Sequence, residues 1–171
     1  MICFSLRLLL FCLPLIFFCC QKKDSWQHSA IRNTDPRYDL AKLTYPADTV
    51  HRGIEIELMR QHKGIEGYVN VYTFEVPPLE DSPHKAKISF LSDHHEYTFI
   101  VDRLQGGQRL HLSETALSTL LSLFEKHSEV TIEMAHYSQV FNTETFKRHY
   151  QKLCNLPPRF LPEKIVTFEL Y

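Results

Sequence analysis

Apolar and polar residues alternate along much of the chain between residues 54 and 112, and this alternation is the strongest constraint on the fold. A period of two is typical of strands that bury one face. It predicts strands over 54–59, 68–75, 85–91, 97–104 and 109–112. Short polar or glycine-containing turns separate most of these segments, including Gly106-Gly107, which favours hairpins and therefore antiparallel pairing.

The period changes after Ser113, a residue type that often caps a helix N-terminus. Apolar residues then recur at helical spacing, at Leu117, Leu120, Leu121 and Phe124. A second helix is expected after Asn142 as its cap, with an apolar stripe of Phe146, Tyr150 and Leu153. These patterns predict two amphipathic helices.

Two further strands are expected, over 130–134 and 165–170. The predicted fold class is α+β, with a largely antiparallel sheet of about six to seven strands and the two helices. The chain has 171 residues, of which 44% are hydrophobic, so it can bury one sizeable core. We assign this single α+β domain to residues 49–171.

An apolar run over 8–20 follows Arg7 and ends at Cys19-Cys20, before a polar segment that begins at Gln21. The run is shorter than the roughly 20 residues that a membrane-spanning helix needs, and has the length of a signal-peptide core. It resembles a bacterial lipoprotein signal, in which the cysteine that closes the run is acylated. The resemblance implies a signal peptide over 1–19 and a covalent lipid, such as palmitate, on Cys20.

Three alternatives to this assignment stay open. Cys19 could be the acylated residue, the signal could be a cleaved secretory peptide, or it could remain as an uncleaved anchor. If Cys20 is acylated, Gln21 resembles the second residue of lipoproteins that two-membrane bacteria send to the outer membrane.

Residues 20–48 show no persistent helical or strand period, and Asp35-Pro36 and Tyr45-Pro46 interrupt them. We therefore predict an acylated N-terminus and tether over 20–48. The alternative is a strap that packs on the domain through Tyr38, Leu40, Leu43 and Tyr45.

Charge and cysteine content narrow the possible functions. The formal net charge is −1, without the surplus of basic residues that a nucleic-acid-binding protein needs, so no nucleic-acid partner is expected. If Cys20 carries lipid and the signal is removed, Cys154 has no partner within the chain. The domain must then fold without an internal disulfide.

A metal site is the most specific chemical hypothesis, because the chain contains 10 histidines. His94, His95 and Glu96 offer imidazole and carboxylate ligands suited to Zn²⁺. Neighbouring strand residues point to opposite faces, so a site would need a turn here and a further ligand such as His111 or His136. The alternative is an exposed polar turn.

Other candidate sites have simpler structural explanations. Glu55 and Glu57 share a strand face, which allows acid–base chemistry but equally describes a solvent-facing strand. His149 and Cys154 are five positions apart, which does not place them on one helix face. A ligand groove could be lined by aromatic residues, namely Tyr68, Tyr72, Tyr97, Tyr137 and Tyr150. No pattern typical of a catalytic site is found, so we expect no enzyme and no cofactor beyond the lipid.

A proline-rich segment near the C-terminus could present an extended surface to a partner, through Pro157, Pro158, Arg159 and Phe160. We therefore expect a lipid-anchored, extracytoplasmic protein of the bacterial cell envelope. Its domain is predicted to be a protein-interaction or structural module that binds another envelope protein through a sheet edge or the proline-rich segment. The alternative is a small-ligand or metal-binding protein that uses its histidines or an aromatic groove.

Overall fold

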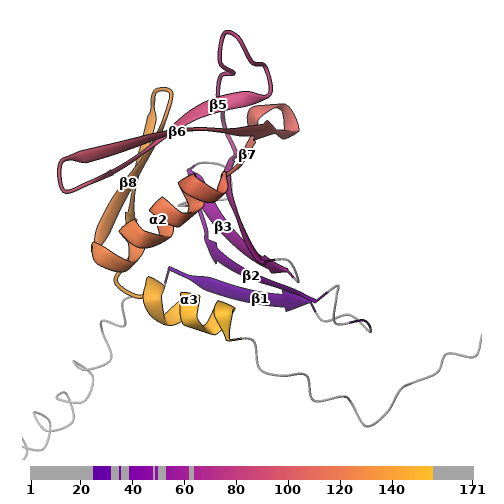
Figure 1. The fold of residues 1–171 in the computed structure, drawn as a ribbon, viewed down its shortest axis with the longest axis vertical. Helices are drawn as coiled ribbons and strands as arrows, with labels where there is room; N and C mark the ends of the chain where they lie inside the picture. Colours follow the sequence, from indigo (N-terminus) through magenta and orange to yellow (C-terminus); the bar gives the residue numbers. More distant parts are fainter. Residues whose placement is uncertain are drawn as a thin grey trace, which may run out of the picture.

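The computed structural model describes residues 25–31, 35, 39–47, 49, 53–61 and 64–155. In these residues the chain forms one antiparallel sheet and two helices (Figure 1). The strands are β1 (Gln27–Ile31), β2 (Leu40–Tyr45), β3 (Ile54–Gln61), β4 (Gly64–Val71), β5 (Lys85–Ser92), β6 (His95–Leu104), β7 (Arg109–His111), β8 (Glu129–Met134) and β9 (Tyr137–Asn142). The helices are α2 (Glu114–Lys126) and α3 (Phe146–Cys154), and a 3₁₀ turn, η2 (Gln105–Gly107), joins β6 to β7.

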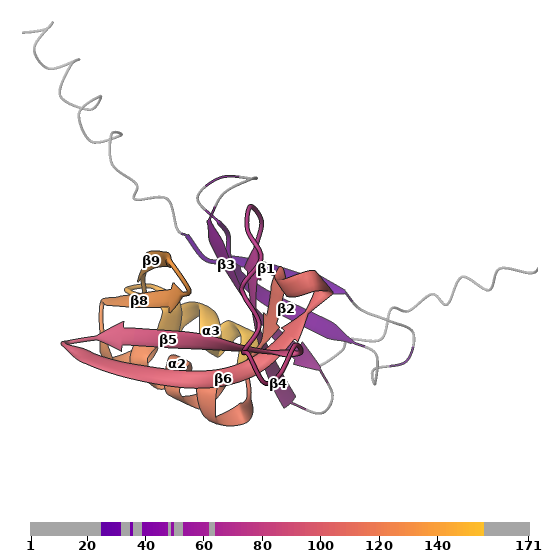
Figure 2. The same ribbon diagram turned by 90° about the horizontal axis from the view of Figure 1, so that it is seen from above.

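The sheet bends around the two helices. Its strand order is β1-β2-β3-β4-β7-β6-β5-β8-β9. Helix α2 contacts both β4 and β8, which lie in different halves of the sheet, and α3 contacts β2. Figure 2 shows β8 and β9 on the left and β1–β4 on the right, with the helices behind β5 and β6. The concave side of the sheet therefore holds the core, and the convex side is its outer face.

A side chain of β9 connects the two ends of the bent sheet. The Gln139 side chain accepts a hydrogen bond from the Ile54 amide at 2.7 Å and donates one to the Ile54 carbonyl at 3.4 Å. Gln139 is buried. Its side-chain amide forms hydrogen bonds with both the N–H and the C=O of Ile54, as the backbone of a neighbouring strand would. Beside it, the rings of Tyr45 in β2 and Phe141 in β9 meet at 5.0 Å.

One hydrophobic core joins the sheet to the helices. The alternation in β3 buries Ile54, Ile56 and Leu58 completely, as the period of two predicts. Trp26, just before β1, is also buried, and its ring lies 5.0–5.8 Å from those of Tyr45, Phe124 and Phe146. These aromatic contacts tie the N-terminal end of the described chain to both helices.

Helix α2 forms as predicted. The Ser113 hydroxyl accepts a hydrogen bond from the Ala116 amide at 3.3 Å, which caps the N-terminus. Glu114 lies in the first turn and Lys126 in the last, where each charge complements the helix dipole. The buried face comprises Ala116, Leu117, Leu120, Leu123 and Phe124.

The predicted number of strands was wrong. The described residues contain nine strands rather than six or seven. Strand β9 was missed because Asn142, which ends it, was read as a helix cap, whereas α3 begins only at Phe146. The strand predicted over 68–75 is β4, which begins earlier and ends at Val71. The strand predicted over 165–170 lies outside the described residues.

The segment predicted as a tether contributes two strands to the sheet. β1 pairs with β2, and β2 pairs with β3, both antiparallel. Ala41 and Leu43 of β2 are buried in the core, so the packed alternative describes these residues better than a tether over 20–48. The strand was missed because Asp35-Pro36 and Tyr45-Pro46, on either side of its central residues, are typical of interruptions; the core contacts of Leu43 stabilise it.

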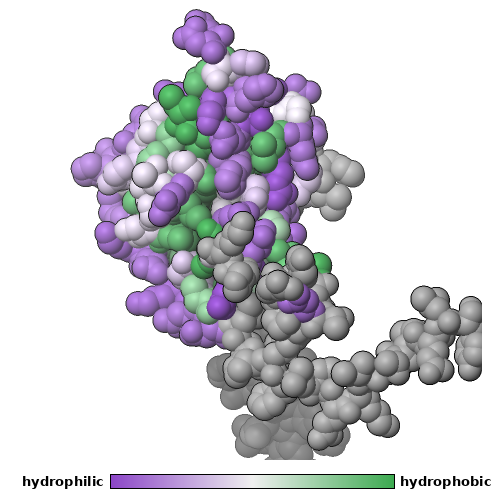
Figure 3. All heavy atoms as spheres, turned by 45° about the vertical axis from the view of Figure 1, so that its right-hand side comes forward, coloured by the Kyte–Doolittle hydropathy of each residue, from purple (hydrophilic) through white to green (hydrophobic). Residues whose placement is uncertain are grey.

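Hydrophobic residues also reach the surface. In Figure 3 they form a band of green among purple hydrophilic residues. Across the described chain the large exposed apolar side chains are Ile31, Tyr72, Tyr97, Ile100, Leu104 and Val140. Such residues are normal singly on a protein surface, so the band alone identifies no site.

Candidate functional site

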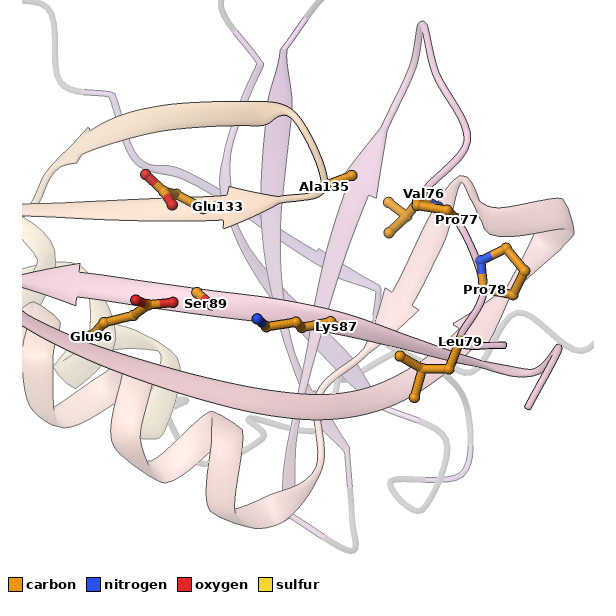
Figure 4. A pocket seen from close by; sticks show the side chains of 9 residues that line it. All are labelled: Val76, Pro77, Pro78, Leu79, Lys87, Ser89, Glu96, Glu133 and Ala135. Carbon is orange, nitrogen blue, oxygen red and sulfur yellow. The ribbon is translucent and has the colours of Figure 1, made fainter. Parts of the chain in front are cut away.

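A charged groove of about 300 Å³ lies on the outer face of the sheet, over β5, β6 and β8. We call it the Lys87 groove; it is lined by Val76, Pro77, Pro78, Leu79, Lys87, Ser89, Glu96, Glu133 and Ala135. Figure 4 shows the carboxylates of Glu96 and Glu133 on either side of Ser89, with Lys87 nearer the segment 76–79. The groove therefore has a charged floor and an apolar wall.

Strand register places the floor residues together. Ser89 in β5 lies opposite Thr98 in β6 and opposite Glu133 in β8. Lys87 is two residues earlier on the same strand, so its side chain shares the outer face. Glu96 belongs to the same face of β6, two residues before Thr98. Three adjacent strands thus bring charges of both signs to one surface.

Arg103 holds the wall in place. Its Nε donates to the Val76 carbonyl at 2.7 Å, and its Nη2 donates to the Gly106 carbonyl at 3.0 Å. The Val76 amide donates to the Gly107 carbonyl at 2.9 Å, and the Leu79 amide donates to the Lys85 carbonyl at 3.0 Å. The wall is therefore fixed at both ends by backbone or charge-assisted hydrogen bonds.

Gly107 allows this arrangement because it has no side chain. Its φ is +92°, a conformation that other residues rarely adopt. A Cβ built there would lie 2.3 Å from Arg103 Nη2, so the guanidinium occupies the space that a side chain would need.

The charged groups of the floor do not pair with one another. In the described part of the chain, Lys87, Glu96 and Glu133 form no ion pair, although opposite charges line the same groove. Hydrogen bonds from Ser89 and Thr98, with a smaller contribution from the Lys87 charge, lower the pKa of Glu96. The Ser138 hydroxyl donates to Glu133 at 3.3 Å. Both carboxylates are thus oriented by hydroxyl groups and remain accessible.

A second groove, of about 520 Å³, adjoins the first at Glu96 and surrounds the β5–β6 turn. It is lined by Leu91, Ser92, Asp93, His94, His95, Glu96, Glu129, Thr131 and Val140. The turn has positive φ at Asp93 and His94, which is uncommon for residues other than glycine. Of the three residues of the predicted metal site, His94 lies in this turn, and His95 and Glu96 are the first two residues of β6.

The structure does not assemble a metal site from these residues. Among the described residues, no three His, Cys, Asp or Glu side chains converge to hold a metal ion. The Nδ1 atom of His95 is 3.0 Å from the Asp93 carbonyl oxygen. His111, proposed as a further ligand, lies 3.7 Å from Asp102 instead. The histidine that does meet the turn is His127, 2.8 Å from Asp93, and no local motif pointed to it because the contact depends on the end of α2.

A second charged region, on β2, β3, β4 and β7, is closed. We call it the Glu57 cluster; it comprises Lys42, Glu57, Tyr68, Asn70 and Arg109. Although Glu57 points to the outer face, only 5% of it is exposed. Its carboxylate lies 3.4 Å from Arg109 and 3.7 Å from Lys42, and accepts a hydrogen bond from Asn70 at 3.1 Å.

The Glu57 cluster explains the fate of the predicted Glu55–Glu57 pair. Asn70 donates to both carboxylates, at 2.9 Å to Glu55 and 3.1 Å to Glu57. The Arg109 guanidinium stacks over the Tyr68 ring at 4.0 Å and covers the cluster. Glu57 is thus neither solvent-facing nor in a cavity that could admit a substrate.

The remaining predicted sites are not assembled either. His149 is buried and bonds to His28 at 3.0 Å rather than to Cys154, which is a free, partly exposed cysteine. The tyrosines of the predicted aromatic groove are dispersed: Tyr137 and Tyr150 pack against the core, and none of the five lines either groove. Burial, with the neighbouring Cys154, raises the pKa of Tyr150 to about 12.

Cys19, Cys20 and the segment of Pro157, Pro158, Arg159 and Phe160 lie outside the described residues. In the part of the chain that the structure describes, no helix is long and apolar enough to cross a membrane. No protein-family profile, no curated protein and no solved structure matches this chain.

Proposed function

We propose that this chain is a lipid-anchored protein of the bacterial cell envelope whose extracytoplasmic domain binds an extended segment of another envelope protein. The anchor rests on the sequence: the apolar run over 8–20, closed by Cys20, resembles a lipoprotein signal. In a host with two membranes, Gln21 favours the outer membrane.

The interaction role rests on one observation, the character of edge strand β1. All five of its residues are exposed, and none is charged or a proline. In the described residues β1 pairs with β2 alone. Natural proteins usually protect such an edge with charges, prolines or bulges, because an open edge is a template for another strand. Apart from the contact of His28 with His149, β1 has none of these protections among the described residues, which supports binding by strand addition.

The position of β1 limits where a partner could lie. Only six residues separate Cys20 from Gln27, and a fully extended chain between these two residues spans at most about 25 Å. An acylated Cys20 would keep β1 close to the membrane surface. A partner segment that adds to β1 would therefore be membrane-proximal.

Acylation is tested by metabolic labelling with a palmitate analogue. We expect labelling of the wild type and loss of the label in Cys20→Ser, with retention in Cys19→Ser. Loss of the label only in Cys19→Ser would identify Cys19 as the acylated residue. An unlabelled wild type would exclude the lipid anchor.

The interaction is tested by cross-linking the full-length protein in its native envelope, followed by mass spectrometry of the products. Ala30→Lys places a charge on β1, and Ser138→Lys places one at an exposed position of the other edge strand, β9. We expect a reproducible partner whose cross-link is lost in Ala30→Lys and kept in Ser138→Lys. Equal loss in both variants, or no partner above background, would reject β1 as the binding edge.

A further inference from the structure

The Lys87 groove carries an inference that does not depend on β1 or on the lipid anchor. We propose that the groove binds a small zwitterion, an α-amino acid with an apolar side chain. Glu96 and Glu133 would receive the ammonium group, Lys87 the carboxylate, and the wall of Val76 to Leu79 the side chain.

The presence of both positive and negative charges in one groove selects this ligand class. A purely cationic ligand would be attracted to two carboxylates but repelled by Lys87, and an anionic ligand would be repelled by both carboxylates. A ligand with both charges a few ångströms apart matches all three groups. In the described chain, Lys87, Glu96 and Glu133 form no ion pair with one another. A ligand can therefore bind these groups without first breaking a salt bridge of the protein.

The placement of the groups supports the same class. Glu96 and Glu133 come from the strands on either side of β5, so their carboxylates flank one position above Ser89 (Figure 4). Lys87 lies on β5 itself, between that position and the wall. An α-amino acid presents its ammonium, carboxylate and side chain in three directions from one carbon, which suits three contact regions around one small space.

The size and chemistry of the groove limit the ligand further. Its volume of about 300 Å³ lies at the lower end of the range for ligand pockets, roughly 300–1,000 Å³. The wall offers Val76, Pro77, Pro78, Leu79 and, from the β8–β9 turn, Ala135, and none of these side chains is polar. A single amino acid of leucine, methionine or phenylalanine type fits this combination.

The wall is held in position before any ligand binds. Arg103 and Gly107 fix Val76 by two hydrogen bonds, and Leu79 is bonded to Lys85 at the start of β5. A preorganised site loses less entropy on binding than one that must first be ordered. Because Lys87 and Glu96 remain in contact with water, we expect weak binding, with a Kd on the order of 1 mM.

The test uses the full-length protein in detergent and measures binding by saturation-transfer NMR and calorimetry. The probes are L-leucine, L-methionine and L-phenylalanine. Leucinamide lacks the carboxylate, and N-acetyl-leucine lacks the ammonium group. We expect binding of at least one amino acid, and at least tenfold weaker binding of both leucine derivatives than of leucine.

Matched variants locate the site. We expect Lys87→Met and Glu133→Gln each to weaken amino-acid binding at least fivefold. Lys147→Met on α3 and Glu129→Gln on β8 each remove an exposed charge outside the Lys87 groove, and should leave binding within twofold of the wild type.

Four results would overturn the proposal. Leucinamide that binds as tightly as leucine would indicate a cation site, and N-acetyl-leucine that does so would indicate an anion site. Equal losses in the control variants would place the binding elsewhere. Absence of binding for all three amino acids would exclude the zwitterion, whatever the outcome of the β1 experiment.

Discussion

The Glu57 cluster and the Lys87 groove lie on the outer face of the same sheet, yet one is closed and the other open. In the cluster, Glu57 has a cation on each side, Lys42 from β2 and Arg109 from β7, and is almost fully buried. In the groove, Lys87 and two glutamates share a cavity without pairing. Polar residues alternate in both regions, so the alternation alone does not decide whether an outer face becomes a site.

The neighbouring strands make the difference. Glu57 lies opposite Tyr68 in β4 and Thr44 in β2, and the long side chains of Arg109 and Lys42 extend over it. Lys87 in β5 lies opposite Ile100 in β6, which carries no charge. The loop 76–79 lies beside Lys87 and does not cover it. Long side chains close one region, whereas a fixed loop keeps a cavity in the other.

The largest expected effect separates the two regions by stability. Arg109→Met leaves the buried Glu57 carboxylate without its main cation, so we expect the free energy of unfolding to fall by about 3 kcal/mol. Lys87→Met removes an exposed cation that has no ion pair, and should produce no measurable change. Urea denaturation of both variants measures the difference. Equal losses of stability in the two variants would show that the buried cluster contributes no more to the fold than the open groove.

A smaller effect is expected at the wall of the groove. Gly107→Ala strains a positive φ and displaces Arg103 from the Val76 carbonyl, so we expect a loss of about 2 kcal/mol and faster hydrogen exchange at the Val76 amide. Gly106→Ala is the matched control: its φ is +67° and a Cβ there meets no atom within 4 Å. It should lose only about 1 kcal/mol and leave the Val76 amide protected. Similar exchange in the two variants would show that Arg103 does not hold the wall.

Next to the Glu57 cluster, the Glu55 carboxylate should be detectable through the pKa of a tyrosine. Partial burial raises the pKa of Tyr72, which is 43% exposed, to about 12, and the Glu55 carboxylate adds to the rise by repelling the phenolate and accepting the phenol hydrogen bond. Glu55→Gln should lower this pKa while leaving it above 10, because burial is the larger cause. Ultraviolet absorbance titration measures it, with Glu96→Gln as a control that should not move it. An unchanged Tyr72 pKa in Glu55→Gln would show that Glu55 does not contribute to the rise.

The smallest effect is expected at the boundary between the two regions, where Asp102 lies between Lys85 at 2.6 Å and His111 at 3.7 Å. Its hydrogen bond to Lys85 lowers the pKa of Asp102. A lowered pKa stabilises the fold above the unfolded-state pKa, and this contribution disappears as the pH falls through the folded-state pKa. Since both side chains are partly exposed, Lys85→Met should cost less than about 1 kcal/mol at neutral pH. Carboxyl NMR should show the Asp102 pKa rising, and a constant pKa would contradict the assignment.

Local signals explain which elements could be predicted. Helix α2 has its cap, its terminal charges and its apolar stripe within one short segment, and it forms as expected. β9 has no such signals: its inward residues include polar Gln139, which is buried only because Ile54 supplies a distant partner. β1 likewise depends on its position beside β2. Both strands pair with a neighbour in the chain, but neither carries the clear alternation of apolar and polar residues that predicts a strand.

The candidate site was beyond sequence reasoning for the same reason. A Pro-Pro pair such as Pro77-Pro78 is typical only of the end of a strand, whereas in the structure these residues form a wall beside β5. The contact that holds the wall joins Arg103 to Val76, 27 positions away, and leaves no local pattern. His94 and His95 were predicted to bind a metal ion because they are adjacent in sequence. In the described residues they do not come together with a third ligand.

The bridge between Gln139 and Ile54 has a consequence for the order in which the domain can be completed. The two residues are 85 positions apart, and contacts of such separation slow folding because a long loop must close before they form. During synthesis, Ile54 at the start of β3 therefore leaves the ribosome long before Gln139, whose side chain forms hydrogen bonds with its backbone. The contact that joins the two ends of the bent sheet can therefore form only after Gln139 has been synthesised, however early the neighbouring hairpins pair.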